Sequence, residues 1–329
     1  MGRKIIVLIL IISLSVIFST PGFASTSAST SASSGVLSGK VIILDAGHGT
    51  NAPIRATIYS EHTHMLILSL KIKPLLEEHG ATVYLTRPTY RFVPLSTRTA
   101  LANIWSLEAL KISTGQQQID EELLINEMAE IDRLIGVMRS VIENPREYAD
   151  VYFNTPFSPT KPMHPDLKRI FELQSNPIIG ESFLFISLHS NATPLPTDRS
   201  VHGADVYHVS NQHRRLSRYY SNYSFVDDSA RFGRILLDHI HDVGIQRRTV
   251  AHANFFVVRE QNLPAVLVEN GHHTNLRDRA NLMNDLFQDN LALAYLNAII
   301  IYFNGTQASP ITLNNFDPID TKLPGLMPY

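Results

Sequence analysis

The sequence predicts an α/β fold, in which a β-sheet is covered by helices on both faces. Three short segments are almost entirely apolar, as expected for strands that are buried on both sides of a sheet. These segments are residues 41–44, 183–188 and 264–268. Apolar residues also recur at helical spacing within residues 61–80, 225–243 and 286–303. That spacing indicates helices with one apolar face that can pack on such a sheet.

The first apolar segment leads directly into an acid and a histidine. Residues 41–50 read VIILDAGHGT, so His48 lies between Gly47 and Gly49. The two glycines permit a sharp turn and leave space for the imidazole at the C-terminal edge of the sheet, where open α/β sheets place their sites. A core or turn histidine is the alternative reading of a single G-H-G motif.

A helix and a strand are predicted next. Residues 61–80 predict a helix that stops at Gly80, with Glu61 in its first turn. A carboxylate at that place can also serve only as a partner for the helix dipole. Residues 81–86 predict a strand, and residues 95–103 predict a short helix that carries Arg98.

The pattern changes between residues 104 and 182, which are charged and favour helix. Apolar residues from Leu123 to Ile142 predict one amphipathic helix, and the proline-rich residues 155–165 predict a loop. We interpret this segment as a helical insert. Its apolar face must be covered, so the insert either packs beside the site as a gate, or serves as a stabilising arm or dimer contact.

The second half of the chain places two more polar side chains at strand ends. His189 follows the apolar segment 183–188, and Glu269 follows 264–268. The other predicted elements are strands at 203–209 and 255–258, and helices at 225–243, 277–283 and 286–303. Two imidazoles and one carboxylate form a set that catalytic zinc uses, with a fourth position left for water. A second acid can then act as general base and later as general acid.

The N-terminus predicts export. Two basic residues precede an apolar run at 5–18, and a small-x-small pattern follows at 22–24. We therefore predict a cleaved signal peptide at residues 1–24 and a periplasmic or extracellular protein. An uncleaved anchor is the alternative, although the run is shorter than the roughly 20 apolar residues that a spanning helix needs. Residues 25–38 are rich in Ser, Thr and Ala and predict a flexible linker.

Composition argues against nucleic acid as a partner and excludes any chemistry that needs cysteine. The 329 residues carry 28 basic and 30 acidic side chains, which argues against nucleic acid as a partner because binding it requires a basic face. The chain has no cysteine, so it has neither disulfides nor a lipid-modified cysteine. Any transition-metal site must therefore use nitrogen and oxygen ligands.

At this point the ordered blocks resemble a known family, the zinc-dependent N-acetylmuramoyl-L-alanine amidases that share the AmiC-type catalytic domain (Amidase_3). The matching blocks are VIILDAGHGT (41–50), the helix that begins with Glu61, VYLTR (83–87), R-x-x-x-A-N (98–103), FISLHSNA (185–192), G-x-x-V-Y (203–207) and LPAVLVENG (263–271) with Asn275. They occur in family order and cover residues 40–303 apart from the insert.

The resemblance implies a fold, a site and an activity. The fold would be a mixed, mainly parallel twisted sheet flanked by helices, related to zinc exopeptidases, with the catalytic domain at 39–304 and a proline-containing tail at 305–329. One zinc ion per chain would be bound by His48, Glu61 and His189, and Glu269 would activate the water. The substrate would be peptidoglycan, cut at the amide between N-acetylmuramic acid and the L-alanine of the stem peptide.

The chain departs from the family pattern in three places. Residues 51–55 replace a turn of small residues, and the insert occupies the place of a short connection. After Glu269 the family usually has a Gly-Phe pair, where this chain reads Asn270-Gly271-His272-His273. We interpret His272 and His273 as exposed polar replacements, with extra ligands or substrate contacts as the alternative. His62 and His64 are interpreted in the same way.

Two other functions compete with the amidase. A wall-binding protein that had kept the fold and lost the chemistry would lack one of the metal ligands or the base, and the sequence lacks none of these residues. A zinc carboxypeptidase or other zinc amide hydrolase on wall peptides would need a pocket for a terminal carboxylate, which the sequence does not exclude. Peptidoglycan is the expected partner, with an activator or regulator protein acting through the insert. After signal cleavage no stable membrane anchor is expected.

Overall fold

The computed structural model describes residues 35–52, 59–116, 121–195, 197–214, 216–220 and 222–305. The predicted signal peptide, most of the predicted linker and nearly all of the predicted C-terminal tail lie outside these residues. Leu37, at the end of the predicted linker, is fully buried, and its N–H donates to the carbonyl of His79 at 2.8 Å. Residues 35–38 therefore belong to the folded unit and not to a linker.

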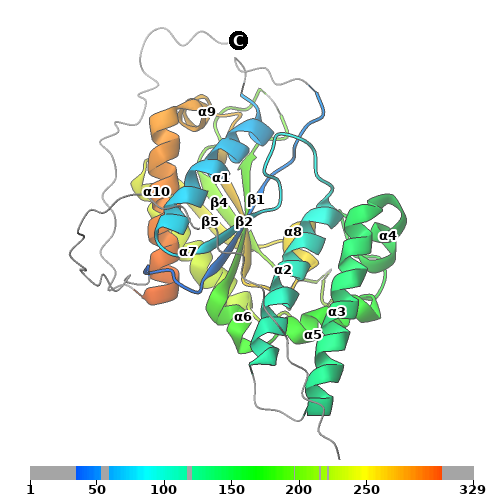
Figure 1. Ribbon diagram of the computed structural model, residues 1–329. Helices are drawn as coiled ribbons and strands as arrows, with labels where there is room; N and C mark the ends of the chain where they lie inside the picture. The colour runs from blue at the N-terminus through cyan, green and yellow to red at the C-terminus, as the bar shows by residue number, and fades with distance from the viewer. Residues whose placement is uncertain are drawn as a thin grey trace, which may run out of the picture. The chain divides into compact units, whose positions relative to one another are not determined.

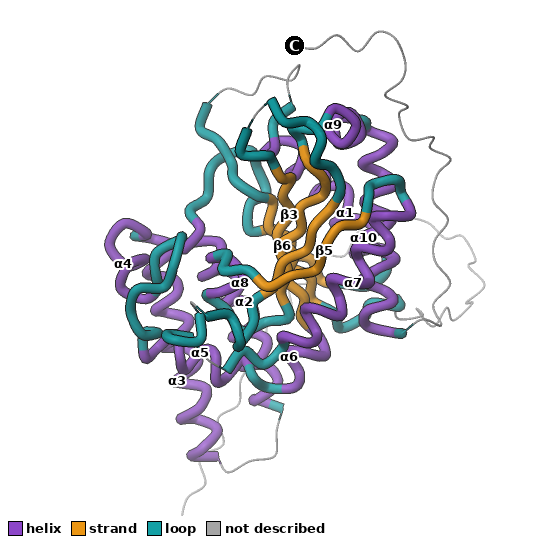
Figure 2. Tube along the Cα trace, turned by 180° about the vertical axis from the view of Figure 1, so that it is seen from behind, coloured by secondary structure: helices purple, strands orange, loops and turns teal. Residues whose placement is uncertain are grey.

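Six strands form one sheet in the order β2-β1-β3-β6-β4-β5. Figure 2 shows this sheet from behind. The strands are β1 (Val41–Ala46), β2 (Thr82–Leu85), β3 (Phe183–Asn191), β4 (Ala204–His208), β5 (Arg247–His252) and β6 (Ala265–His272). Neighbouring strands are parallel except β4 and β6, which run antiparallel. This arrangement confirms the predicted α/β fold with a mixed, mainly parallel sheet.

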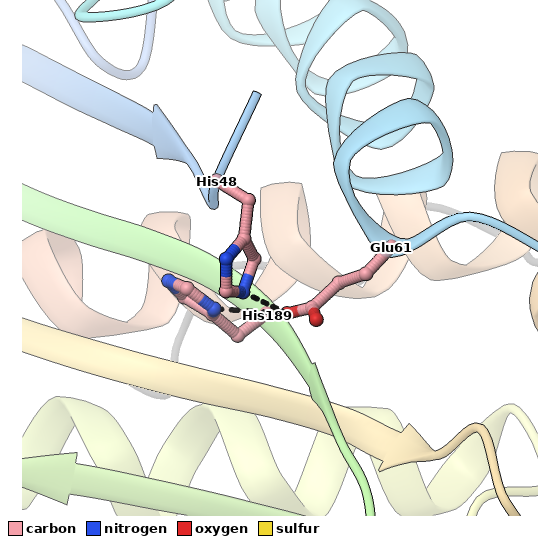
Figure 3. Close-up of side chains that lie close together, drawn as sticks. All are labelled: His48, Glu61 and His189. Atoms are coloured by element: carbon pink, nitrogen blue, oxygen red, sulfur yellow. Dashed lines mark hydrogen bonds and ion pairs between the residues drawn. The ribbon is translucent and has the colours of Figure 1, made fainter. Parts of the chain in front are cut away.

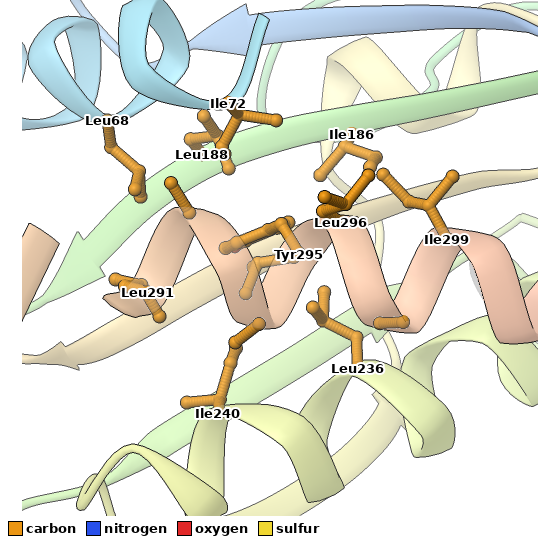
Figure 4. Packing of buried hydrophobic residues seen from close by; sticks show 14 of the residues in the cluster. Leu68, Ile72, Ile186, Leu188, Leu236, Ile240, Leu291, Tyr295, Leu296 and Ile299 are labelled. Atoms are coloured by element: carbon orange, nitrogen blue, oxygen red, sulfur yellow. The ribbon is translucent and has the colours of Figure 1, made fainter. Parts of the chain in front are cut away.

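Three long helices cover one face of the sheet (Figure 1). They are α1 (Glu61–Glu78), α7 (Val226–Asp242) and α10 (Asp285–Asn304). Figure 4 shows Leu296 and Ile299 of α10 beside Ile186 of β3, and these three residues belong to one buried cluster with Ile72 of α1 and Leu236 of α7. Although α10 is long and apolar enough to cross a membrane, 72% of its apolar window is buried inside the protein. It is therefore the core helix that holds the sheet to α1 and α7.

Most of the other helices lie on the opposite side of the sheet, where the two longest of them pack on each other (Figure 1). They are α2 (Leu95–Gly115), α3 (Glu121–Glu143), α4 (Pro145–Tyr152), α5 (Pro165–Gln174), α6 (Pro177–Ser182) and α8 (Phe256–Arg259). Proline begins α4, α5 and α6, where its missing N–H costs no helical hydrogen bond and its fixed φ suits the first turn. The remaining helix, α9 (Leu276–Met283), follows β6 and is capped by the side chain of Asn275.

The insert begins later than predicted and is integrated into the fold. The helix predicted at 95–103 continues as α2 to Gly115, because Leu107 and Leu110 extend its buried face. The amphipathic α3 buries Leu134 and Met138 in the same hydrophobic cluster as those residues. The apolar face of the insert is thus covered within the chain.

One local prediction differs from the structure, and one strand was not predicted. Residues 255–258 were predicted as a strand, but the single turn of helix α8 begins at Phe256, since a four-residue helix is too short to display a helical period. Strand β5 was missed because it is a largely exposed edge strand of polar residues, Arg247–His252, without an apolar alternation.

Candidate functional site

The turn after β1 has the unusual backbone that its two glycines predicted. His48 itself takes a positive φ of 60°, and Gly49 follows with a φ of 114°. At Gly47 the reason for glycine is contact: a Cβ there would lie 2.5 Å from the imidazole of His189. The turn can therefore bring His48 and His189 together only when residue 47 has no side chain.

Two buried arginines hold this turn through hydrogen bonds to its backbone carbonyl groups. Arg87 donates to the carbonyls of Ala46 at 2.8 Å and Gly47 at 2.9 Å. Arg98 donates to the carbonyl of Ala46 at 3.1 Å and to that of His48. Backbone carbonyls bound by fixed guanidinium donors cannot rotate freely, so the position of His48 is set by two residues that lie 39 and 50 positions further along the chain.

Asp45 supplies a buried negative charge that pairs with one of these arginines, Arg98. Its carboxylate is fully buried, accepts a hydrogen bond from Ser187 at 2.7 Å and lies 3.4 Å from Arg98. Burial alone would raise its pKa, but Arg98 and the hydroxyls of Thr86 and Ser187 together hold the pKa of Asp45 below its usual range. The acid predicted at the end of β1 is therefore structural, the partner of an arginine.

The structure brings His48, Glu61 and His189 into one cluster, as Figure 3 shows. Glu61 Oε1 lies 3.0 Å from Nε2 of His48 and 2.9 Å from Nδ1 of His189, and it accepts a hydrogen bond from the N–H of Ser190 at 3.1 Å. Burial would raise the pKa of Glu61, but hydrogen bonds from both imidazoles and their positive charge keep that pKa well below its usual range.

This cluster fits a metal ion. One donor atom from each of His48, Glu61 and His189 lies within 4.8 Å of the others. Two imidazole nitrogens and one carboxylate oxygen match the set that catalytic zinc takes from proteins, leaving one position open. His48 is exposed while Glu61 and His189 are partly buried, so the cluster opens to solvent on the side of His48.

Glu269 lies next to the cluster without belonging to it. It is the register partner of His189 across β3 and β6, and its Oε2 is buried with no hydrogen-bond partner among the described residues. Burial, together with the negative charges of Glu61 and Asp205, raises the pKa of Glu269 to about 8. A carboxyl group that holds its proton near neutral pH has the acid–base range that a proton-transfer residue needs.

The four histidines interpreted as exposed are all at least partly buried. His272 is 4% exposed, and its Nδ1 lies 3.0 Å from the carbonyl of Gly203. His273 is partly buried against Ser190, and its ring stacks on Tyr59. His62 and His64 are partly buried as well, with contacts to Ser60. The interpretation was wrong because the contacts of His272 and His273 come from segments that are distant in sequence.

Three further residues near the site were not singled out from the sequence. Asp205 is 1% exposed, pairs with Arg248 at 3.0 Å and is the register partner of Glu269 on β4. Tyr59 and Ser190 lie 2.5 Å apart through their hydroxyl oxygens. The sequence could have indicated Tyr59 and Ser190 by their closeness to the predicted ligands, because Tyr59 precedes Glu61 by two residues and Ser190 directly follows His189.

Comparison with known proteins gives a consistent family match. Residues 42–111 and 158–300 match the family described as N-acetylmuramoyl-L-alanine amidase. The chain is 21% identical over 274 residues to the N-acetylmuramoyl-L-alanine amidase AmiC of Escherichia coli O6:H1 (strain CFT073), an alignment that covers 80% of this chain and 52% of that protein. The chain thus spans about half the length of that relative.

Two solved structures are similar at lower identity. The catalytic domain of CwlV, an N-acetylmuramoyl-L-alanine amidase from Bacillus (Paenibacillus) polymyxa var. colistinus, is 19% identical with a TM-score of 0.47, and the match covers 81% of this chain and 99% of that one. The amidase AmiC2 of Nostoc punctiforme is 18% identical with a TM-score of 0.47, covering 80% and 97%. The family match spans more than half of the sequence, and the chain belongs to the N-acetylmuramoyl-L-alanine amidase family.

Proposed function

We propose that this chain is a peptidoglycan amidase that hydrolyses the amide bond between N-acetylmuramic acid and the L-alanine of the stem peptide. The observation that carries the proposal is the convergence of His48, Glu61 and His189 at one edge of the sheet, with Glu269 beside them. All four residues lie inside the two ranges that match the family. Membership of the family supports the choice of bond and substrate.

In this proposal His48, Glu61 and His189 hold one zinc ion per chain. When bound, zinc supplies a Lewis acid that polarises a carbonyl group and lowers the pKa of water. The protein's own part is to fix the three ligands. Arg87 and Arg98 hold the turn that carries His48, and the N–H of Ser190 holds the carboxylate of Glu61.

Glu269 moves the proton. It accepts a proton from the attacking water and returns it to the nitrogen of L-alanine as the amide bond breaks, so that the amine leaves in neutral form. The buried Oε2 of Glu269 has no partner among the described residues, which leaves it available for this exchange. Because β3 and β6 place Glu269 opposite His189, base and ligand belong to the same edge of the sheet.

The proposal extends to where the enzyme works. A peptidoglycan substrate implies action in the periplasm or at the cell wall, which agrees with the predicted signal peptide. A regulator that binds the insert remains a prediction. Residues 112–157 fall outside the family match, and within them Leu123 and Ile125 are exposed near the start of α3. This segment is therefore the place at which regulation particular to this chain would act.

Digestion of purified peptidoglycan tests the function. The mature protein with zinc is incubated with intact peptidoglycan, and the released fragments are identified by mass spectrometry. An amidase releases stem peptides with a free L-alanine amine and leaves the glycan strands intact. Release of terminal residues from the stem would indicate a carboxypeptidase, and absence of new ends with retained binding would indicate a wall-binding relic.

A further inference from the structure

Three aromatic rings form a stack beside the cluster of His48, Glu61 and His189. The ring of Tyr59 lies between those of His64 and His273, with centroids 4.7 Å and 5.1 Å apart and interplanar angles of 12° and 23°. Tyr59 and His64 flank Glu61 in sequence, whereas His273 follows β6. The stack therefore joins the start of α1 to the edge of the sheet.

Hydrogen bonds connect the same stack to Glu61 through Ser190. The Oγ of Ser190 lies 2.5 Å from the hydroxyl of Tyr59 and 3.0 Å from Nδ1 of His273, while its N–H donates to Glu61 Oε1. Nδ1 of His273 is also 3.1 Å from the carbonyl of Ser190. A carbonyl can only accept, so Nδ1 carries the proton and donates.

His273 is itself firmly placed. Its own N–H donates to the carbonyl of Asn191 at 2.8 Å, which ties the residue to the end of β3. The main chain of His273 thus binds Asn191 and its side chain binds Ser190, and both of these residues belong to β3. The residue is a bridge between β6 and the strand that delivers His189.

The start of α1 depends on such contacts because it lacks an ordinary cap. Ser60 occupies the N-cap position, yet its side chain makes no capping hydrogen bond. Its Oγ instead lies 2.9 Å from Nδ1 of His62. A helix end without a side-chain cap is less firmly fixed, and Glu61 is the first residue of this helix.

We propose that His273 is a positioning residue for the metal site: through Ser190 and Tyr59 it fixes the carboxylate of Glu61 where it meets His48 and His189. The inference rests on the proposed function in one respect, that these three residues bind zinc. The ring of His273 binds Ser190, so in this proposal it is neither a metal ligand nor a residue that contacts the substrate. Ser190 is the group that hydrogen-bonds the ligand Glu61, and His273 holds Ser190 in place. Loss of a ligand's hydrogen-bond partner typically costs about 10–100-fold in metal affinity.

Zinc affinity tests the proposal without reference to activity. Zinc is titrated into the metal-free mature protein in competition with a chelating indicator, for the wild type, His273→Ala and His273→Phe. The Phe variant keeps a ring against Tyr59 and loses the hydrogen-bond donor. His239→Ala is the matched control, since His239 is a partly buried histidine whose Nδ1 contacts a carbonyl, that of Ile235 on α7, away from the site. Thermal unfolding of each metal-free protein is measured in parallel.

The expected result is an increase of about tenfold or more in the zinc dissociation constant for both His273 variants, with metal-free melting temperatures within a few degrees of the wild type. The His239→Ala variant should bind zinc as the wild type does. Wild-type zinc affinity in His273→Phe overturns the proposal, and so does an equal loss in the control. If wild-type protein binds zinc but releases no stem peptide from peptidoglycan, the proposed function fails while the role of His273 stands.

Discussion

His189 and Glu269 are register partners on the parallel strands β3 and β6. Partners in neighbouring strands project to the same face of a sheet, so one strand pair brings the proposed metal ligand and the proposed proton-transfer residue side by side. Asp205 of β4 is the partner of Glu269 on its other side. Glu269 thus lies between an imidazole and a second carboxylate, and burial together with the negative charges of Glu61 and Asp205 raises its pKa.

The first prediction separates a base from a ligand at Glu269. Glu269→Gln keeps the size of the side chain and removes its ability to accept a proton. We expect zinc content and fold to survive while turnover on peptidoglycan falls by about 10²–10⁴-fold, the usual loss for a general acid–base group. Metal analysis and peptide release, measured on the same preparation, check this.

Either of two results at Glu269 would contradict the proposed mechanism. Loss of zinc together with activity would make Glu269 a ligand. Near-normal turnover with zinc retained would mean that another residue moves the proton. Asp205→Asn is a useful companion variant, because it removes a neighbouring negative charge while leaving Glu269 in place.

The second prediction concerns stability and pH in the metal-free protein. The pKa of Glu269 is about 8 in the folded state against 4.5 for an ordinary glutamate, so between these pH values the folded protein holds a proton that the unfolded chain has released. The free energy of unfolding should therefore fall as pH rises from 5 to 8. One pKa unit corresponds to about 1.4 kcal/mol, so the loss amounts to a few kcal/mol.

The variant Glu269→Gln provides the check. Glutamine does not titrate, so this part of the pH dependence should vanish, and the metal-free variant should be more stable than the wild type at pH 8 and closer to it at pH 5. Urea unfolding at both pH values measures the difference. A difference between the two proteins that is the same at pH 5 and pH 8 would refute the raised pKa.

The third prediction concerns the turn at Gly47. Its φ is not positive, so alanine is not excluded by backbone conformation, but the new Cβ would approach the ring of His189 to 2.5 Å. We expect Gly47→Ala to displace His189 and to weaken zinc binding by at least about tenfold, in line with the cost of disturbing a ligand's support. Gly136→Ala in α3 is the control, because a Cβ there meets nothing within 4 Å. Zinc binding by Gly47→Ala at wild-type affinity would refute the requirement for glycine at this position.

Much of the site was predictable because its side chains directly follow or begin elements with strong local signals. His48 follows β1, and His189 and Glu269 lie inside the C-terminal parts of β3 and β6, directly after continuous apolar runs that reflect burial on both faces. Glu61 begins a helix with a periodic apolar face. These signals depend on neighbours in sequence, and a single chain displays them.

What was missed depends on contacts between distant segments. His273 and Ser190 are 83 residues apart, so the sequence around either residue contains no pattern that predicts their hydrogen bond. The exposed edge strand β5 has no buried face to impose a pattern. The insert was recognised as amphipathic, but its partner could not be identified, because the face that covers α3 belongs to a helix, α2, whose length was underestimated.

The last prediction decides between a gate and an arm for the insert. Leu134 and Met138 of α3 are fully buried in the cluster that includes Leu107 of α2. That same helix carries Arg98, which holds the His48 turn. Covering of the apolar face by α2 favours an arm, so Leu134→Ala and Met138→Ala should each lower the free energy of unfolding by about 2–5 kcal/mol, the cost of a large-to-small change in a core.

The control and the activity assay complete the test. Ile125 lies on the same helix but is 59% exposed, and Ile125→Ala should change stability by less than about 0.5 kcal/mol. Activity per folded molecule on intact peptidoglycan should stay near that of the wild type in all three variants, because an arm stabilises the domain without covering the site. A gate loosened by the same substitutions would admit substrate more readily. Increased turnover on intact wall in Leu134→Ala or Met138→Ala, with Ile125→Ala unchanged, would therefore contradict a purely stabilising role of the insert and support its role as a gate.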